Sequence, residues 1–170
     1  RKGNIDTLKI FCEKNKIELE EIGLILNDQN SNKISSSAIR ENLKSGKFEL
    51  ANKDLERNFS VAGKVIKGDQ RGRTIGIPTA NLEYPLNTIT IPYGVYAVET
   101  LIEGNTYFGI VNFGIRPTFN KDKPIVEAYL FDFDKDIYDR DIEILFHKQI
   151  RQEKKFNDIK ELLNQINIDI

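Results

Sequence analysis

The segment that decides the fold class is GVYAVETLIEGNTYFGIVNFG, residues 94–114. Residues 94–102 and 107–114 are dominated by β-branched and aromatic side chains, which are typical of strands. Between them lies Glu103-Gly104-Asn105, whose glycine can adopt the positive φ that a hairpin turn requires. The segment therefore predicts two antiparallel strands joined by a tight turn.

Three more stretches alternate in the same way and predict further strands, over residues 59–67, 125–133 and 141–150. Most of the connections between strands are long and rich in Gly, Pro and Asp. Apolar residues at helical spacing then predict a closing helix over 157–168. Antiparallel strands with long loops and one terminal helix predict a small closed β-barrel with the helix packed on it.

The first third of the chain has a different, α/β pattern. The pattern predicts helices over residues 5–15 and 48–56, a further helix that ends at Lys44, and a strand over 17–26. Ser35 or Ser36 can cap the start of the middle helix, and Gly46 can end it. At Arg57–Asn58 the period changes from helical to alternating, which predicts one domain over residues 1–57 and a second over 58–170.

The composition excludes several functional classes. The 25 basic and 26 acidic residues leave a formal charge of -1, which gives no electrostatic reason to expect nucleic acid or an anionic membrane as partner. Cys12 and His147 are single residues of their types, so zinc sites and Ser-His or Cys-His triads lack partners. One cysteine fits the reducing cytoplasm. The chain begins at Arg1 and contains no methionine, which predicts a piece of a longer protein.

Residues 68–81, GDQRGRTIGIPTAN, have the composition of an anion-binding loop. Gly68, Gly72 and Gly76 permit tight turns that point main-chain N–H groups at an anion. Arg71 and Arg73 add charge of the right sign for phosphate. A solvated hairpin loop would have much the same composition, so on these residues alone the two interpretations are about equal.

The end of that loop favours the first interpretation. Pro78 pushes its predecessor toward an extended conformation, and in an extended segment Thr79 and Asn81 project to the same side. A hydroxyl and a carboxamide oxygen that converge in this way can hold Mg²⁺ beside nucleotide phosphates. The alternative is the start of a strand with two capping side chains.

Glu127 lies in IVEAYLF, residues 125–131, a predicted strand that is largely apolar on both faces. A carboxylate in an internal strand is costly unless it is paired or used. It is therefore a candidate general base. The competing interpretation, equally weighted on the sequence alone, is a buried ion pair with Lys123 or Arg116.

Residues 151–156, RQEKKF, follow the last predicted strand. A charged run at such a place is usually a solvated connection. Arg151 and Phe156 could instead contact a planar ligand, because guanidinium groups stack on ring systems.

Taken in order, these motifs resemble riboflavin kinases. The likeness is carried by residues 68–81, 94–96, 112–119, 136–138 and 151–156 together with Glu127. Residues 34–40, ISSSAIR, and 1–4, RKGN, resemble elements of the nucleotidyltransferase half of bacterial bifunctional FAD synthetases. Ser37 replaces the usual threonine there, and the His-x-x-His motif of that half is absent from this chain.

The resemblance implies a six-stranded antiparallel Greek-key barrel with a C-terminal helix, preceded by the remnant of a Rossmann-like nucleotidyltransferase domain. It implies transfer of the γ-phosphate of ATP to the 5′-hydroxyl of riboflavin, giving FMN, with Mg²⁺ as cofactor. Site residues implied for that reaction are Glu127 as base, Thr79 and Asn81 for the metal, Gly68, Gly72, Arg73, Gly76 and Pro78 for ATP, and Tyr138, Arg151 and Phe156 for the flavin. Ser35, Ser36 and Arg40 would remain from the adenylyltransferase site.

Two rival classes can be weighed against this expectation. A flavin or nucleotide sensor would bind without turnover, but a sensor needs no base at Glu127. A β-barrel nucleic-acid binder would need a basic face with exposed aromatic residues, which the near-neutral charge does not favour. The expected partners are thus two small molecules, with neither nucleic acid nor membrane.

Overall fold

The computed structural model describes residues 4–23, 33–85, 87–115 and 124–170, except the side chain of Arg71. The chain forms two units, Arg1–Ile34 and Ser35–Ile170. Within the described residues, no helix is long and apolar enough to cross a membrane.

The first unit contains helix α1 (Ile5–Asn15), which has the predicted bounds. The Asn4 side chain accepts a hydrogen bond from the Thr7 N–H at 2.9 Å and so caps the helix. The strand predicted over 17–26 is wrong for residues 17–23, which form no strand, while residues 24–26 lie outside the described part. Ile17 and Ile22 are 53% and 83% exposed, and this segment pairs with no strand among the described residues. A Rossmann-like remnant therefore stays a prediction.

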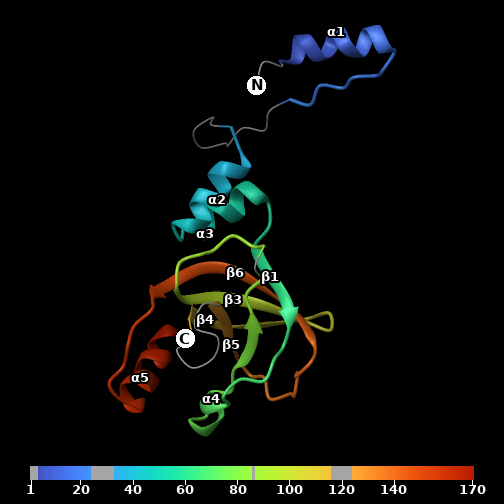
Figure 1. The fold of residues 1–170 in the computed structure, drawn as a ribbon. Coiled ribbons are helices and arrows are strands. Elements are labelled where there is room, and N and C mark those ends of the chain that lie inside the picture. The colour runs from blue at the N-terminus through green and yellow to red at the C-terminus, as the bar shows by residue number, and fades with distance from the viewer. Residues whose placement is uncertain (1–3, 24–32, 86, 116–123) are drawn as a thin grey trace. The chain divides into compact units, whose positions relative to one another are not determined.

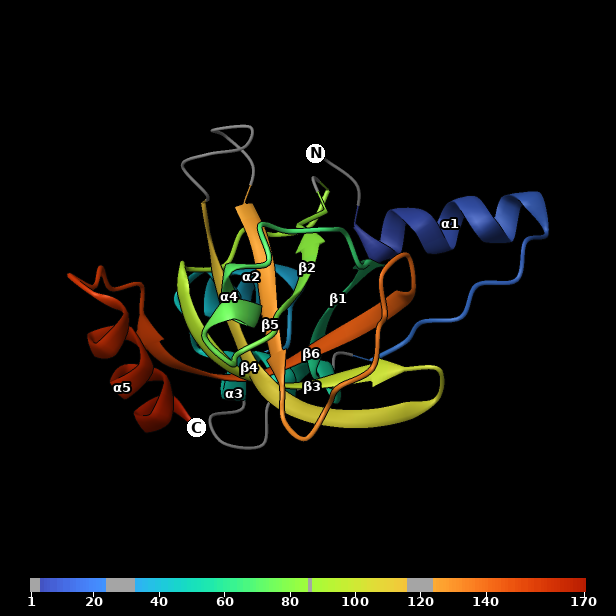
Figure 2. The ribbon, with the colours of Figure 1, turned by 90° about the horizontal axis from the view of Figure 1, so that it is seen from below.

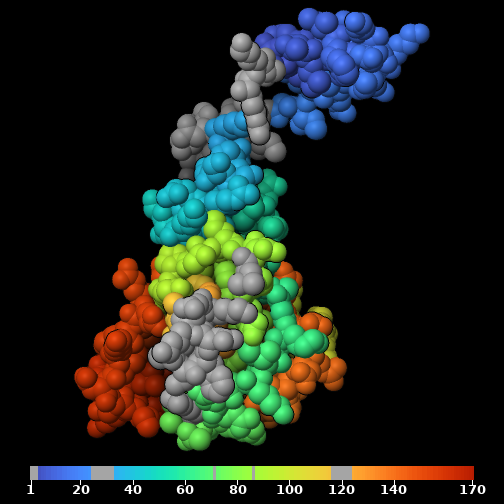
Figure 3. Space-filling view, viewed as in Figure 1, coloured from blue at the N-terminus to red at the C-terminus, as the bar shows by residue number. Residues whose placement is uncertain are grey.

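Helices α2 (Ser36–Lys44) and α3 (Phe48–Leu55) belong to the second unit. The predicted N-cap is confirmed, because the Ser35 hydroxyl accepts a hydrogen bond from the Ala38 N–H at 3.2 Å. Phe48 of α3 is fully buried among aromatic rings of the sheet. Figure 3 shows α2 and α3, in cyan and teal, in direct contact with the atoms below them. The two helices thus share the core of the sheet, and the predicted domain boundary at Arg57–Asn58 stays a prediction.

The sheet has six antiparallel strands, β1 (Phe59–Lys64), β2 (Ala80–Glu83), β3 (Gly94–Ile102), β4 (Asn105–Ile115), β5 (Pro124–Leu130) and β6 (Asp141–Gln152). Their order is β1-β6-β3-β4-β5-β2, so β6 returns to lie beside β3 in the Greek-key arrangement. The sheet curls strongly, and its edges meet where the Ile66 N–H donates to the Asn81 carbonyl oxygen at 2.8 Å (Figures 1 and 2). The predicted barrel architecture is confirmed.

Two elements were not predicted as regular structure. β2 is only four residues long, and helix α4 (Arg71–Thr74) is a single turn inside the glycine-rich loop. Both are too short for a periodic pattern to appear in the sequence. The closing helix, α5 (Ile159–Asp169), begins two residues later than predicted, because Asp158 caps it by accepting from the Glu161 N–H at 2.8 Å.

Candidate active site

One row of residues runs across five strands of the sheet. Successive register partners in this row are Asn81 (β2), Glu127 (β5), Asn112 (β4), Val95 (β3) and Arg151 (β6). Side chains directly opposite each other in antiparallel strands lie on the same face. Their neighbours Leu82, Val126 and Phe113 are completely buried in the core. The row therefore lies on the outer face of the barrel.

A cavity of about 410 Å³, the helix-side cavity, is lined by four residues of this row, Glu127, Asn112, Val95 and Arg151, while Asn81 lines neither this cavity nor the one described next. Its apolar wall comes from the loop before β2, from the sheet and from α5, namely Ile75, Ile77, Val95, Ile110, Tyr129, Phe156, Leu162 and Ile166. Its polar residues include Asn112, Glu127, Arg151, Glu153 and Asp169. This apolar slot, which also contains many polar and charged groups, suits a ligand with a large ring system and polar substituents.

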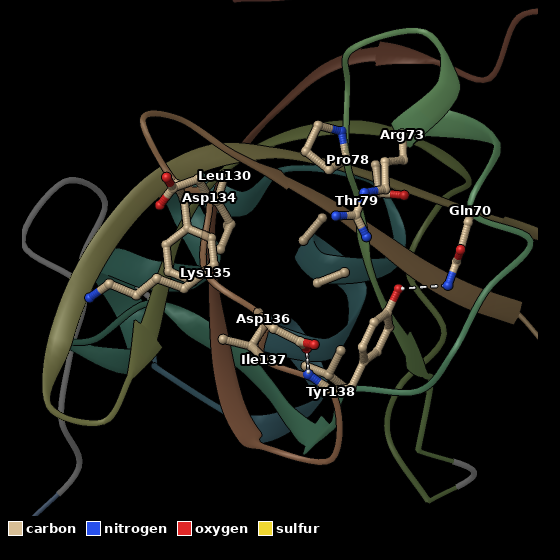
Figure 4. A pocket seen from close by; sticks show the side chains of 14 residues that line it. Gln70, Arg73, Pro78, Thr79, Leu130, Asp134, Lys135, Asp136, Ile137 and Tyr138 are labelled. Carbon is tan, nitrogen blue, oxygen red and sulfur yellow. Dashed lines mark hydrogen bonds between the residues drawn. The ribbon is translucent and has the colours of Figure 1, made fainter.

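A second cavity of about 330 Å³, the loop-side cavity, lies between the glycine-rich loop and residues 133–138 (Figure 4). Arg73, Pro78 and Thr79 line one part of it, and Lys135 and Tyr138 line another. The Gln70 side-chain amide donates to the Tyr138 hydroxyl at 3.3 Å across this cavity (Figure 4). Its lining also includes the carboxylates Asp134 and Asp136, so cationic, anionic and aromatic groups occur together, a mixture that suits a polar ligand with a ring.

Gln70 and Thr79 are the two described residues that line both cavities. The cavities therefore adjoin each other at the end of the glycine-rich loop, where β2 begins. Thr79 therefore belongs to the walls of both cavities.

Two glycines allow the loop to lie directly on the β2 segment. A Cβ atom at Gly68 would come 2.4 Å from the Asn81 amide nitrogen, and one at Gly72 would come 2.1 Å from the Ile77 carbonyl oxygen. Real Cβ atoms essentially never approach so closely, so neither position accepts a side chain without movement of the loop. Gly76 has a φ of +80°, which favours glycine. The structure therefore gives all three predicted glycines a local role in shaping this loop.

The predicted metal ligands lie close together. Asn81 is 3% exposed, and its side-chain nitrogen donates to the Thr79 backbone carbonyl at 3.3 Å. No group of three or more His, Cys, Asp or Glu residues that could hold a metal occurs within the described ranges. A hydroxyl and a carboxamide fit Mg²⁺ in the form that keeps several waters and binds through substrate phosphates.

Glu127 lies between Asn81 and Asn112 in the register and faces the helix-side cavity. The two candidate ion-pair partners, Lys123 and Arg116, lie outside the described residues. A buried ion pair at Glu127 therefore stays an alternative interpretation. The strand itself is internal to the sheet, as predicted.

The predicted flavin residues fall in different cavities. Arg151 and Phe156 line the helix-side cavity, with the guanidinium carbon 5.6 Å from the ring centroid. Tyr138 lines the loop-side cavity with Arg73. The structure therefore does not bring Tyr138 together with the other two. Ser35, Ser36 and Arg40 line neither cavity.

Sequence reasoning missed Asp169. This residue is 8% exposed near the end of α5, and it forms an ion pair with Arg151 at 2.8 Å. A signal was present, since Leu162, Ile166 and Asp169 fall on one face of the helix at spacings of four and three. A carboxylate on the apolar face of a helix indicates a partner beneath it.

Two cavities with shared wall residues, one of them lined by the Glu127 carboxylate, are compatible with an enzyme that binds two substrates. The riboflavin kinase family model matches residues 55–170. The bifunctional riboflavin kinase/FMN adenylyltransferase of Bacillus subtilis (strain 168) is 48% identical over 140 residues, which cover 81% of this chain and 44% of that protein. Its counterpart from Buchnera aphidicola subsp. Acyrthosiphon pisum is 41% identical over 173 residues, 100% of this chain and 54% of that protein.

Among solved structures, the crystal structure described as a macrolide-efflux protein from Streptococcus pneumoniae has a TM-score of 0.86 and 31% identity, covering 99% of this chain and 54% of that one. The chain thus spans about half the length of the curated relatives it matches. The chain belongs to the riboflavin kinase family.

Proposed function

We propose that this chain transfers the γ-phosphate of ATP to the 5′-hydroxyl of riboflavin, giving FMN and ADP. The observation that carries the proposal is the junction of the two cavities at Thr79, with Glu127 facing one of them and Arg73 lining the other. Phosphoryl transfer depends mainly on alignment and charge neutralisation, so two substrates that meet at one point satisfy its chief requirement.

The chemistry of the walls assigns one substrate to each cavity. The loop-side cavity has Arg73 beside Thr79 for phosphate charge and the Tyr138 ring for a base, and it would hold ATP with Mg²⁺ offsetting the nearby carboxylates Asp134 and Asp136. The helix-side cavity has the apolar and aromatic wall that the isoalloxazine ring requires. This division moves Tyr138 from the flavin set, where the sequence placed it, to the nucleotide set.

The residues at the junction would then act as follows. Glu127 accepts the proton of the riboflavin 5′-hydroxyl while that oxygen forms its bond to the γ-phosphorus and the bond to the β-phosphate oxygen breaks. Thr79 and Asn81 would hold Mg²⁺, which supplies charge neutralisation on the ATP phosphates. The N–H groups of the loop from Gly68 to Gly76, with Arg73, would hold the remaining phosphate charge.

A second activity concerns the whole protein. Because the curated relatives that cover the full length of this chain are bifunctional, we propose that a longer parent protein also adenylylates FMN to FAD. Residues 1–57 would be the end of that domain. In this chain the Ser35 hydroxyl caps α2, and the His-x-x-His motif of the family is absent. We therefore expect FMN to be the final product here, formed in the cytoplasm from two small molecules.

The test is chromatographic analysis of the purified chain after incubation with riboflavin, ATP and Mg²⁺. Formation of FMN with equimolar ADP supports the proposal. Riboflavin binding without turnover would instead identify the sensor, and failure to bind either substrate would refute both functions.

A further inference from the structure

The strongest feature that this reaction scheme leaves unused is an ion pair between Arg151 and Asp169. Arg151 is at the end of β6, and Asp169 is in the last turn of α5. The Arg151 Nε lies 2.9 Å from each carboxylate oxygen of Asp169, and Nη2 lies 2.8 Å from Oδ2. The Asp169 side chain is 2% exposed and that of Arg151 is 20% exposed. This is a buried, forked pair of the kind that fixes a guanidinium in one orientation.

The hydrogen-bonding capacity of Asp169 is already used within the protein. Besides the two contacts from Nε and the one from Nη2, its Oδ1 accepts from the Gln165 side-chain amide at 3.0 Å. A buried carboxylate that accepts from two side chains has little capacity left for a substrate. Asp169 therefore acts on a ligand through Arg151 and not by direct contact.

Arg151 retains donors that have no partner among the described residues. Of its five N–H groups, one on Nε and one on Nη2 face Asp169, and one on Nη1 donates to the Gln152 carbonyl at 3.2 Å. One N–H on each of Nη1 and Nη2 is left. Because Arg151 lines the helix-side cavity, these two N–H groups on adjacent guanidinium nitrogens are its donors for a ligand there.

We infer that Asp169 is a positioning residue for flavin recognition: it holds Arg151 so that two N–H groups can donate to the flavin. The isoalloxazine ring carries carbonyl oxygens and unprotonated ring nitrogens along its polar edge, and a planar fork matches two acceptors on one edge. The Phe156 ring, 5.6 Å from the guanidinium carbon, supports the same orientation from the side. This inference rests on the proposed use of the helix-side cavity for riboflavin.

Two variants separate positioning from simple structural support. Asp169→Asn removes the charge and keeps the size, and it should weaken riboflavin binding about tenfold, as expected for losing oriented, charge-assisted hydrogen bonds. Arg151→Met combined with Asp169→Leu replaces the pair by apolar side chains, which often restores or raises stability when a buried ion pair is removed whole. The double variant should therefore recover the melting temperature but not the riboflavin affinity.

A neighbouring ion pair provides a matched control. Lys154 and Glu161 join the same segment to the same helix at 3.5 Å, but their side chains are 51% and 37% exposed. Glu161→Gln should leave riboflavin affinity within twofold of the parent chain. An exposed ion pair contributes little free energy, so its loss should not change how the segment holds a ligand. The Michaelis constant for ATP should also stay unchanged in Asp169→Asn, since Asp169 does not line the loop-side cavity.

The measurement is riboflavin titration followed by quenching of flavin fluorescence without nucleotide, with thermal melting of each variant in parallel. Parent-like affinity in either Asp169→Asn or the double variant would overturn the inference, because the pair would then be structural only. FMN formation by the parent chain tests the proposed function separately. If the chain forms FMN but its riboflavin affinity does not depend on Asp169, only the positioning role is refuted.

Discussion

Asn81 of β2 lies directly opposite Glu127 of β5, so the predicted metal ligand and the predicted base share one face of one strand pair. Opposed residues in antiparallel strands have Cβ atoms about 4.5–5.5 Å apart. The pairing brings together two residues that are 46 positions apart along the chain, as their numbers 81 and 127 show. The predicted base and the predicted metal ligand therefore cannot move independently, and a shift in the β2–β5 register would displace both.

Substitution of Glu127 tests the base. Glu127→Gln keeps the size of the side chain but cannot accept a proton, so turnover should fall about 10²–10⁴-fold. Riboflavin affinity should change much less, because the amide can still accept a hydrogen bond. Rates of FMN formation and fluorescence titration measure the two quantities. Turnover within a few-fold of the parent would remove Glu127 from the mechanism.

Thr79→Ala tests the metal site. Loss of one oxygen ligand should raise the Mg²⁺ concentration needed for half-maximal FMN formation, while riboflavin binding in the absence of metal should remain nearly intact. Thr79→Ser, which keeps the hydroxyl, is the matched control and should need the same Mg²⁺ concentration as the parent chain. An unchanged requirement in the alanine variant would count against a metal at this position.

Gly72→Ala tests the packing of the loop. Its new Cβ would lie 2.1 Å from the Ile77 carbonyl oxygen, so the loop must move away from the junction of the cavities. We expect the Michaelis constant for ATP to rise about tenfold or more, because displacement of groups that position a substrate has effects of at least this size. The melting temperature should change little. Gly63→Ala in β1 is the control, because its nearest atom would be a flexible Leu82 methyl group at 3.5 Å. Equal Michaelis constants for ATP in the two variants would refute a role of the loop in ATP binding.

Truncation tests which residues the barrel needs. Phe48 of α3 is 0% exposed and packs on Tyr96 and Phe146, with ring centroids 5.1 and 5.9 Å away. A chain cut at Ser35 should keep its melting temperature, whereas one cut at Asn58 should lose several kcal/mol of stability, since removal of a single buried Phe side chain costs about 3–5 kcal/mol. Leu50→Ala is the control, because Leu50 of α3 is 43% exposed and its truncation should cost much less stability. Equal stability of the two truncated chains would instead support independence of the segment after Arg57.

The product itself can be checked in the same assays. The chain should accumulate FMN from riboflavin, ATP and Mg²⁺ without forming FAD, because adenylyl transfer needs its own site for charge neutralisation during pyrophosphate departure. Chromatography resolves the two flavins. FAD formed at a rate comparable to FMN would mean that residues 1–57 carry more of that site than Ser35, Ser36 and Arg40 suggest.

Local patterns in the sequence were sufficient for most of the fold. Alternation, the hairpin turn at Glu103-Gly104-Asn105 and the capping serine at Ser35 depend only on neighbouring residues, and the structure confirms the corresponding strands, turn and helix. The same logic fails over residues 17–23, since alternation specifies a strand only where a partner strand and a core exist for it.

Tertiary structure alone decided how the site is divided. The spacing of Tyr138, Arg151 and Phe156 in the sequence does not show that Tyr138 lines one cavity and the other two residues line another. That division depends on how the sheet closes on itself. The Arg151–Asp169 pair likewise joins residues 18 positions apart, as their numbers show, and forms only when α5 folds back over the outer face of the barrel. The sequence by itself determined which side chains can do the chemistry; the curvature of the sheet and the docking of α5 decided which of them meet, since side-chain contacts between distant residues follow from packing and not from local propensity.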